Sequence, residues 1–161
     1  MEPRSATLRL HHVGIIVPDL EAGVRKIDAM LPGLLWSAAI TDPLQQVMVR
    51  FAGSKDAGGP LYEVLAPTIA TSPISAALRE RRDAVHHLAY LCADLTREGD
   101  RLRNTGCLPV TEPTPARAFA EALIQFFYTP ANFLIELIEH EGPVITPVSY
   151  THLTLPTIYS V

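Results

Sequence analysis

The chain has 161 residues, of which 48% are apolar and 19% are charged, and its formal net charge is −4. This size and composition predict one globular domain or two small packed halves, and they exclude an intrinsically disordered protein. The acidic balance excludes a nucleic-acid partner, and no apolar run approaches the ~20 residues of a membrane span. Its two cysteines, Cys92 and Cys107, form no CxxC pair, so we expect a reducing, cytoplasmic compartment.

The first part of the chain predicts a strand, a helix and three further strands. Residues 10–17 are apolar and β-branched, as in a strand. Asp19 can cap the following helix, whose apolar stripe ends at Pro32-Gly33. A glycine-rich turn is expected at residues 55–60. The three later strands are expected at residues 34–40, 47–51 and 61–65.

The second part repeats this order. A strand is expected at residues 85–92, Asp94 can cap a helix, and Gly106 can end it. The later strands are expected at residues 108–110, 123–128 and 133–138, and a short linker helix at residues 74–82. We therefore predict two βαβββ modules, at residues 8–67 and 84–141, with a linker at residues 68–83.

The two modules also share sequence motifs. Residues 11–20 read HHVGIIVPDL and residues 86–95 read HHLAYLCADL, so each motif runs from a histidine pair to Asp-Leu. Residues 61–67 read LYEVLAP and residues 134–140 read LIELIEH, each with a glutamate inside an apolar run. This internal repeat indicates two copies of one structural unit.

The repeat places one histidine and one glutamate at matching positions of both modules. These four residues are His12, Glu63, His87 and Glu136. A carboxylate is costly to bury in an apolar strand unless it is paired or binds a metal. Two imidazoles and two carboxylates suit a divalent transition ion. The alternative is that the histidines are core residues and the glutamates face solvent. Strand alternation predicts that His11 and His86 point to the opposite face.

In these motifs the chain resembles the vicinal oxygen chelate superfamily, which includes glyoxalase I and methylmalonyl-CoA epimerase, over residues 8–140. The resemblance implies an α+β fold in which two tandem βαβββ modules form a cup-shaped mixed sheet around one divalent ion of Co, Ni, Mn, Zn or Fe. It implies the metal ligands His12, Glu63, His87 and Glu136. It also implies that Glu136 shuttles a proton in isomerase, epimerase or lyase chemistry. Members of the superfamily often form homodimers.

The chain departs from the epimerases at Leu44, which stands where they carry a catalytic glutamate. Leucine cannot transfer a proton, so two-base epimerisation of methylmalonyl-CoA is not expected. We expect another small oxygenated or acyl-thioester substrate, or a one-base isomerisation or lyase reaction. Gln45 and Gln46 are candidates for orienting a substrate oxygen, and Arg117 for meeting an anionic group; solvent exposure is the alternative for each. A second departure lies at residues 118–122, which read AFAEA, where the resemblance implies a glycine-containing turn before the next strand.

Three other functions remain open within the resemblance. A small-molecule binding or resistance protein keeps the cup without turnover, but it would have a broken ligand set. A metal-binding relic without turnover is supported by Leu44. A dioxygenase of this superfamily uses two histidines and one glutamate on iron, and Glu63 argues against it.

The last residues, 148–161, match neither module. They read VSYTHLTLPTIYSV, and VSYTHL resembles one reading frame of a transposon end used to prepare sequencing libraries. We interpret this segment as a non-native, adapter-derived tail and exclude it from the fold. The alternative is a genuine short tail.

Overall fold

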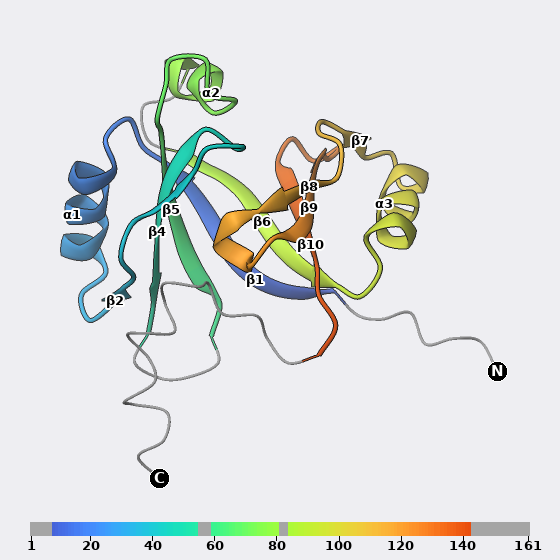
Figure 1. Ribbon diagram of the computed structural model, residues 1–161, viewed down its shortest axis with the longest axis horizontal. Coiled ribbons are helices and arrows are strands. Elements are labelled where there is room, and N and C mark those ends of the chain that lie inside the picture. Colours follow the sequence, from blue (N-terminus) through green and yellow to red (C-terminus); the bar gives the residue numbers. More distant parts are fainter. Residues whose placement is uncertain (1–7, 55–58, 81–83, 143–161) are drawn as a thin grey trace, which may run out of the picture.

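Figure 1 shows the computed structural model, which describes residues 8–54, 59–80 and 84–142. The first run of elements is β1 (Arg9–Ile16), α1 (Leu20–Met30), β2 (Leu35–Trp36), β3 (Ile40–Asp42), β4 (Val47–Gly53) and β5 (Leu61–Pro67). After α2 (Ser75–Glu80), the second run is β6 (Ala84–Cys92), α3 (Leu95–Asn104), β7 (Leu108–Pro109), β8 (Thr114–Ala116), the 3₁₀-helix η1 (Arg117–Phe119), β9 (Ala122–Tyr128) and β10 (Leu134–Glu139). The predicted α+β class is confirmed. The proposed tail lies outside the described residues.

The ten strands form one mixed sheet with a near-symmetric order. The order is β2-β4-β5-β1-β6-β10-β9-β7, with β3 beside β4 and β8 beside β9. The first strands of the two runs, β1 and β6, pair antiparallel at the centre. On either side, β5 pairs parallel with β1 and β10 pairs parallel with β6. The sheet curls around the central pair (Figure 1), so the two runs face each other.

Two edge segments differ from the sequence predictions. The strand expected at residues 34–40 is divided into β2 and β3, because the hydroxyl of Ser37 accepts the backbone N–H of Phe51 between them. The short strand β8 was not predicted. Its neighbourhood carries Pro113 and Pro115, and proline in a strand is tolerated only at edges or bulges, so the segment has the pattern of a loop.

The two long helices cover the outer face of the sheet. Asp19 caps α1 by accepting the backbone N–H of Ala22, and Asp94 caps α3 by accepting that of Arg97. The buried residues of the α1 layer are Val17, Leu20, Val24, Ile27, Val64 and Ala66. Those of the α3 layer are Cys92, Leu95, Leu102, Cys107, Phe127 and Leu137. Strand residues next to these, such as Glu63 and Glu136, therefore point to the inner face.

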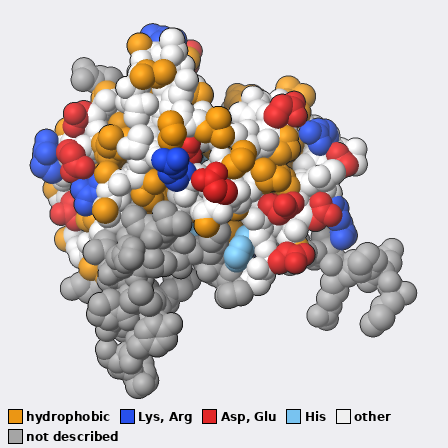
Figure 2. Space-filling model, in the orientation of Figure 1, with side chains coloured by type: hydrophobic (Ala, Val, Ile, Leu, Met, Phe, Trp, Pro, Cys, Tyr) orange, Lys and Arg blue, Asp and Glu red, His pale blue; other side chains and the backbone are white. Residues whose placement is uncertain are grey.

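The surface pattern agrees with this layering. In Figure 2, charged side chains gather over α1 on one side and over α3 on the other. In the described part of the chain, no helix combines the length and apolar character needed to cross a membrane.

Candidate metal centre

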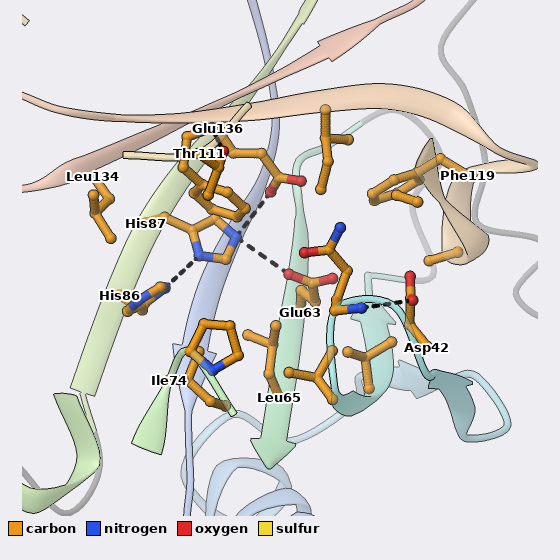
Figure 3. A pocket seen from close by; sticks show the side chains of 18 of the residues that line it. Asp42, Glu63, Leu65, Ile74, His86, His87, Thr111, Phe119, Leu134 and Glu136 are labelled. Carbon is orange, nitrogen blue, oxygen red and sulfur yellow. Dashed lines mark hydrogen bonds and ion pairs between the residues drawn. The ribbon is translucent and has the colours of Figure 1, made fainter. Parts of the chain in front are cut away.

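The inner face of the sheet lines a pocket of about 270 Å³ (Figure 3). Its walls are mainly apolar and come from both modules, the segment before α2, and η1. The apolar lining residues are Val47, Val49, Leu65, Pro73, Ile74, Val110, Ala116, Ala118, Phe119, Ile124, Phe126 and Leu134. The polar lining residues are Asp42, Gln45, Glu63, His86, His87, Thr111 and Glu136. Among the described residues, no lysine or arginine lines this pocket.

The register of the central strands brings the histidines and glutamates together. In the β1–β6 pair, His87 lies opposite Gly14, and Gly14 in turn lies opposite Glu63 on β5. By the same rule, His12 lies opposite Ala89, and Ala89 lies opposite Glu136 on β10. Each histidine is therefore separated from the glutamate of the other module by one strand position, which is a glycine in one case and an alanine in the other.

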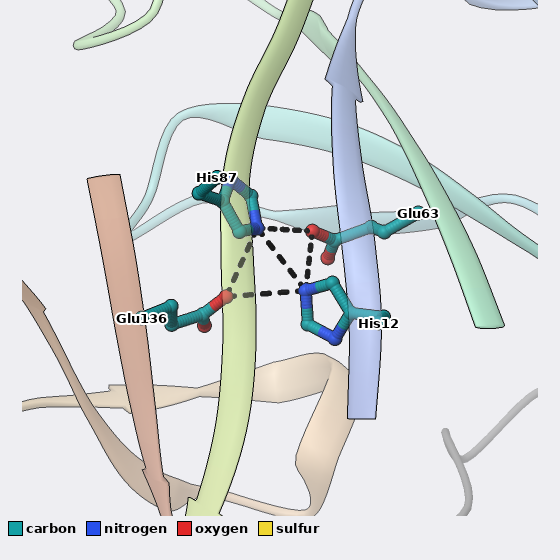
Figure 4. A group of neighbouring side chains, drawn as sticks. All are labelled: His12, Glu63, His87 and Glu136. Atoms are coloured by element: carbon teal, nitrogen blue, oxygen red, sulfur yellow. Dashed lines mark hydrogen bonds and ion pairs between the residues drawn. The ribbon is translucent and has the colours of Figure 1, made fainter. Parts of the chain in front are cut away.

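The four side chains meet at one point (Figure 4). Nε2 of His12 lies 3.1 Å from Oε2 of Glu63 and 3.1 Å from Oε2 of Glu136. Nε2 of His87 lies 3.2 Å and 3.1 Å from the same two oxygens. The two Nε2 atoms are 3.1 Å apart. All four residues are buried, so neither glutamate faces solvent.

Gly14 has a role in the site that was not predicted from the sequence. A Cβ atom built on Gly14 would lie 2.0–2.4 Å from three ring atoms of His87. The imidazole therefore occupies the space that any side chain at position 14 would need. Since His87 reaches over Gly14 toward Glu63, the glycine lets the two modules share one centre. The only sequence signal was the glycine in HHVG, where the second motif has Ala89.

The expectation that His11 and His86 point away from the centre is wrong. Nδ1 of His11 lies 2.9 Å from Nδ1 of His12, and Nδ1 of His86 lies 2.9 Å from Nδ1 of His87. The β1–β6 register shifts at both histidine pairs. At such a β-bulge the period-two alternation of side chains is interrupted, and this explains why neighbouring rings lie together.

The four central groups shift one another's pKa values. Burial lowers the pKa of His12, but Glu63 and Glu136 outweigh burial and raise this pKa to about 10. The pKa of His87 is raised by the same two carboxylates against burial. Burial raises the pKa of each glutamate, but the two histidines outweigh it and hold both pKa values below their usual range. Without a bound ion, the carboxylates are therefore charged at neutral pH, and His12 is protonated.

The donor atoms fit a single divalent transition ion. One nitrogen or oxygen from each residue lies within 4.8 Å of all the others. Ligand atoms about 2.0–2.2 Å from a common ion lie about 3–3.5 Å from one another at the usual coordination angles, and five of the six separations in the cluster are 3.1–3.2 Å. Oε2 of Glu136 is also buried, and it faces the two histidine nitrogens at 3.1 Å. A buried oxygen of this kind is suited to a metal.

The predicted substrate-binding residues lie in different places. Gln45 lines the pocket, whereas Gln46 and Arg117 do not belong to its lining. The side chain of Arg117 is exposed, and its backbone N–H donates to Asp42. Leu44 is 61% exposed and also lies outside the lining. The substrate-binding roles of the two glutamines and of Arg117 stay predictions.

Asp42 is a pocket residue that was not predicted from the sequence. Its Oδ1 accepts the backbone N–H groups of Leu44 and Gln45, and its Oδ2 accepts that of Arg117, each at 3.0 Å. The first two donors belong to the β3–β4 turn and the third to η1. The buried Asp42 therefore ties the two modules together beside the pocket.

Comparison with known proteins identifies the group to which this fold belongs. A family model described as the glyoxalase/bleomycin resistance protein/dioxygenase superfamily matches residues 11–128. The chain belongs to this superfamily. The resemblance in the sequence motifs is thereby confirmed. No curated protein sequence matches the chain.

Solved structures with similar folds include methylmalonyl-CoA epimerases. The Mycobacterium tuberculosis epimerase is 26% identical, with a TM-score of 0.70, over 88% of this chain and 95% of that chain. A Streptomyces coelicolor epimerase variant, in complex with 2-nitronate-propionyl-CoA, is 26% identical, with a TM-score of 0.69, over 88% and 100%. An epimerase in complex with methylmalonyl-CoA and NH4+ is 25% identical, with a TM-score of 0.69, over 88% and 100%. These similarities support the epimerase-like relationship.

Proposed function

We propose that this chain is a metal-dependent isomerase, epimerase or lyase that moves a proton next to a carbonyl group of its substrate. The observation that carries the proposal is the buried cluster of His12, Glu63, His87 and Glu136 beside an apolar pocket. Two buried carboxylates are costly unless their charge is balanced. A divalent cation balances both while the histidines stay neutral.

The four side chains would hold one ion of Co²⁺, Ni²⁺, Mn²⁺, Zn²⁺ or Fe²⁺, because mixed nitrogen and oxygen ligands suit these ions. When bound, such an ion supplies a Lewis acid that stabilises negative charge on a carbonyl oxygen. The apolar pocket walls exclude water from the reacting carbon.

Glu136 is the residue that we assign to proton transfer. It lines the pocket. Its Oε2 faces the two histidines and would bind the ion, so we assign the other carboxylate oxygen, Oε1, to accept the proton of a substrate C–H group. Asp42 is less suited, because three backbone N–H groups already occupy its two oxygens. Leu44 supplies no acid or base. The proposal therefore uses Glu136 as the single base.

The substrate class follows from the pocket and from the similar structures. The Streptomyces coelicolor epimerase and the epimerase with methylmalonyl-CoA were both solved with CoA thioesters. A cavity of about 270 Å³ holds an acyl group but not the whole of coenzyme A, since complete small-molecule sites are about 300–1,000 Å³. Acyl-CoA thioesters are therefore the first substrates to test, followed by hemithioacetals.

Hydrogen–deuterium exchange at the carbon beside the substrate carbonyl tests this proposal. The chain, loaded with each ion in turn, is incubated in D₂O with acyl-CoA thioesters, and exchange is followed by proton NMR. We expect exchange by the unmodified chain and a loss of at least about 100-fold in Glu136→Gln, which removes the base and keeps its size. Glu112 is exposed and lies outside the pocket lining. Glu112→Gln therefore serves as the matched control and should leave the exchange rate unchanged.

Two results would contradict the proposal. Exchange at an unchanged rate in Glu136→Gln would show that another group moves the proton. No exchange with any of these substrates, while an ion is bound, would favour a small-molecule binding protein instead. The aromatic pocket residues Phe119 and Phe126 would then serve as its ligand contacts.

A further inference from the structure

We propose that His11 and His86 are positioning residues: each accepts a hydrogen bond from Nδ1–H of the neighbouring metal-binding histidine and so leaves Nε2 of that histidine free for the ion. This inference rests on the proposed metal centre. It assigns a role to the first histidine of each HH motif, which the proposed reaction does not use.

The same contact occurs in both modules. The Nδ1–Nδ1 distance is 2.9 Å in the His11–His12 pair and 2.9 Å in the His86–His87 pair. The two rings of each pair are nearly perpendicular, at 81° and 85°. Each contact is between consecutive residues at a shift of the strand register. Two independent copies of the same geometry argue against chance packing.

Other aromatic contacts hold the two outer rings in place. The ring of His11 meets Phe119 edge-on, with centroids 5.4 Å apart. The ring of His86 lies 6.3 Å from that of Phe126. His11 is 2% exposed and His86 is partly buried, so neither ring is a free surface side chain. Each ring is therefore held where it can act on its neighbour.

The position of each proton follows from the chemistry of metal binding. A histidine that binds an ion through Nε2 uses the lone pair of that nitrogen, and as a neutral ring it carries its hydrogen on Nδ1. One hydrogen lies between two nitrogens at 2.9 Å, so Nδ1 of His12 donates to His11, and Nδ1 of His87 donates to His86. His11 and His86 must then carry their own hydrogens on Nε2. Such outer partners fix the tautomer and orientation of metal-binding histidines.

The two outer histidines differ in their surroundings. His86 lines the pocket, whereas His11 does not belong to the lining. With Nδ1 as the acceptor, His86 presents a neutral ring with its N–H at Nε2 in the pocket wall. The proposal therefore makes His86 a direct link between the pocket and the orientation of His87.

Nitrogen-15 NMR of the zinc-loaded chain tests the assignment directly, because long-range ¹H–¹⁵N spectra identify the tautomer of each imidazole. We expect hydrogen on Nδ1 in His12 and His87, and on Nε2 in His11 and His86. Hydrogen on Nδ1 of His11 or His86 would overturn the proposal. If zinc does not bind to the chain at all, the proposed metal centre fails as well, so the two failures are distinguishable.

Zinc affinity in variants gives a second test. His86→Leu fits the apolar pocket but removes the acceptor, and we expect a loss of about 10–100-fold in affinity. His86→Asn places an amide oxygen near the position of Nδ1 and should restore most of the affinity. His140→Leu, after β10 and outside the pocket lining, controls for loss of a histidine and should bind zinc normally. Equal affinity in His86→Leu and the unmodified chain, with the fold retained, would overturn the proposal.

Discussion

His87 and Gly14 show how one residue makes room for another. The imidazole of His87 lies where a side chain at position 14 would be, and it must stay there to reach Glu63 at 3.2 Å. The glycine was visible in the sequence, but its role was not, because the role depends on the register between two strands that are distant along the chain. The four metal-binding candidates were predictable because the repeat marks them as two pairs.

Gly14→Ala should displace His87, since the added Cβ would overlap its ring. We expect the affinity for zinc to fall by about 10–100-fold, the range seen when the support of a metal-binding histidine is disturbed. A competition titration with a zinc-binding dye measures the change, and circular dichroism checks the fold. Ala89→Gly, at the matching position opposite His12, removes a methyl group without a clash and should keep its affinity. Unchanged affinity in Gly14→Ala would show that His87 does not need this space.

Metal binding should release protons. The pKa of His12 is raised to about 10 in the absence of an ion, so its Nε2 is protonated at neutral pH and must lose that proton to bind. We expect release of at least one proton per ion at pH 7, and an affinity that rises about tenfold per pH unit for each proton released, up to the pKa of His12. Calorimetry in buffers of different ionisation enthalpy measures the number. A binding enthalpy that is independent of the buffer would contradict the prediction.

The same pKa shifts predict how the ion-free protein responds to pH. The pKa of Glu63 is lowered in the fold, so its stabilising contribution is present above its ordinary pKa and is lost as the pH falls below that range. The pKa of His12 is raised, so its contribution is present below about pH 6.5 and is lost as the pH rises toward 10. The ion pair between Glu63 and His12 therefore stabilises the ion-free protein most between the ordinary pKa of a glutamate and about pH 6.5.

At the scale of elements, the sequence predicted most strands and both capped helices, because their apolar periods and caps are local signals. The errors lie where local patterns are interrupted by long-range contacts. His11 and His86 sit at β-bulges, which hydrophobic alternation cannot reveal, and β8 contains a proline that is typical of a loop. At residues 118–122 the chain departs from the glycine-containing turn that the resemblance implies, as its sequence already showed. Ala120 and Glu121 adopt left-handed conformations there, with φ of 53° and 66°.

Replacing Ala120 with glycine should stabilise the protein. A non-glycine residue in the left-handed region costs about 1–2 kcal/mol, and glycine would relieve this strain. Part of the relief is offset by the greater conformational freedom of glycine in the unfolded chain. We expect Ala120→Gly to raise the free energy of unfolding by about 0.5–1 kcal/mol, as measured by urea denaturation. Ala122→Gly, in the strand β9, is the matched control and should lower it. A loss of stability in Ala120→Gly would contradict the strain at this turn.

At the scale of the whole molecule, two modules of one chain supply a complete set of candidate ligands. The internal repeat predicted this pairing, since side chains at matching positions of two modules that pack with twofold symmetry can converge on one point. The pocket could not be predicted in the same way, because Phe119 and Ile74 belong to η1 and the segment before α2, which have no repeat partner in the sequence. Asp42, through its bond to Arg117, also joins segments that no local pattern connects. A homodimer and the module boundaries stay predictions.

The metal content of the purified chain shows whether the four side chains bind one divalent ion. Elemental analysis is made after incubation with Co²⁺, Ni²⁺, Mn²⁺, Fe²⁺ or Zn²⁺ and removal of the excess, beside a His12→Ala/His87→Ala double variant. We expect about one divalent ion per chain, because the cluster offers one site of four ligands, and loss of that ion in the double variant. No bound ion in the unmodified chain, or an equal amount in both proteins, would contradict it.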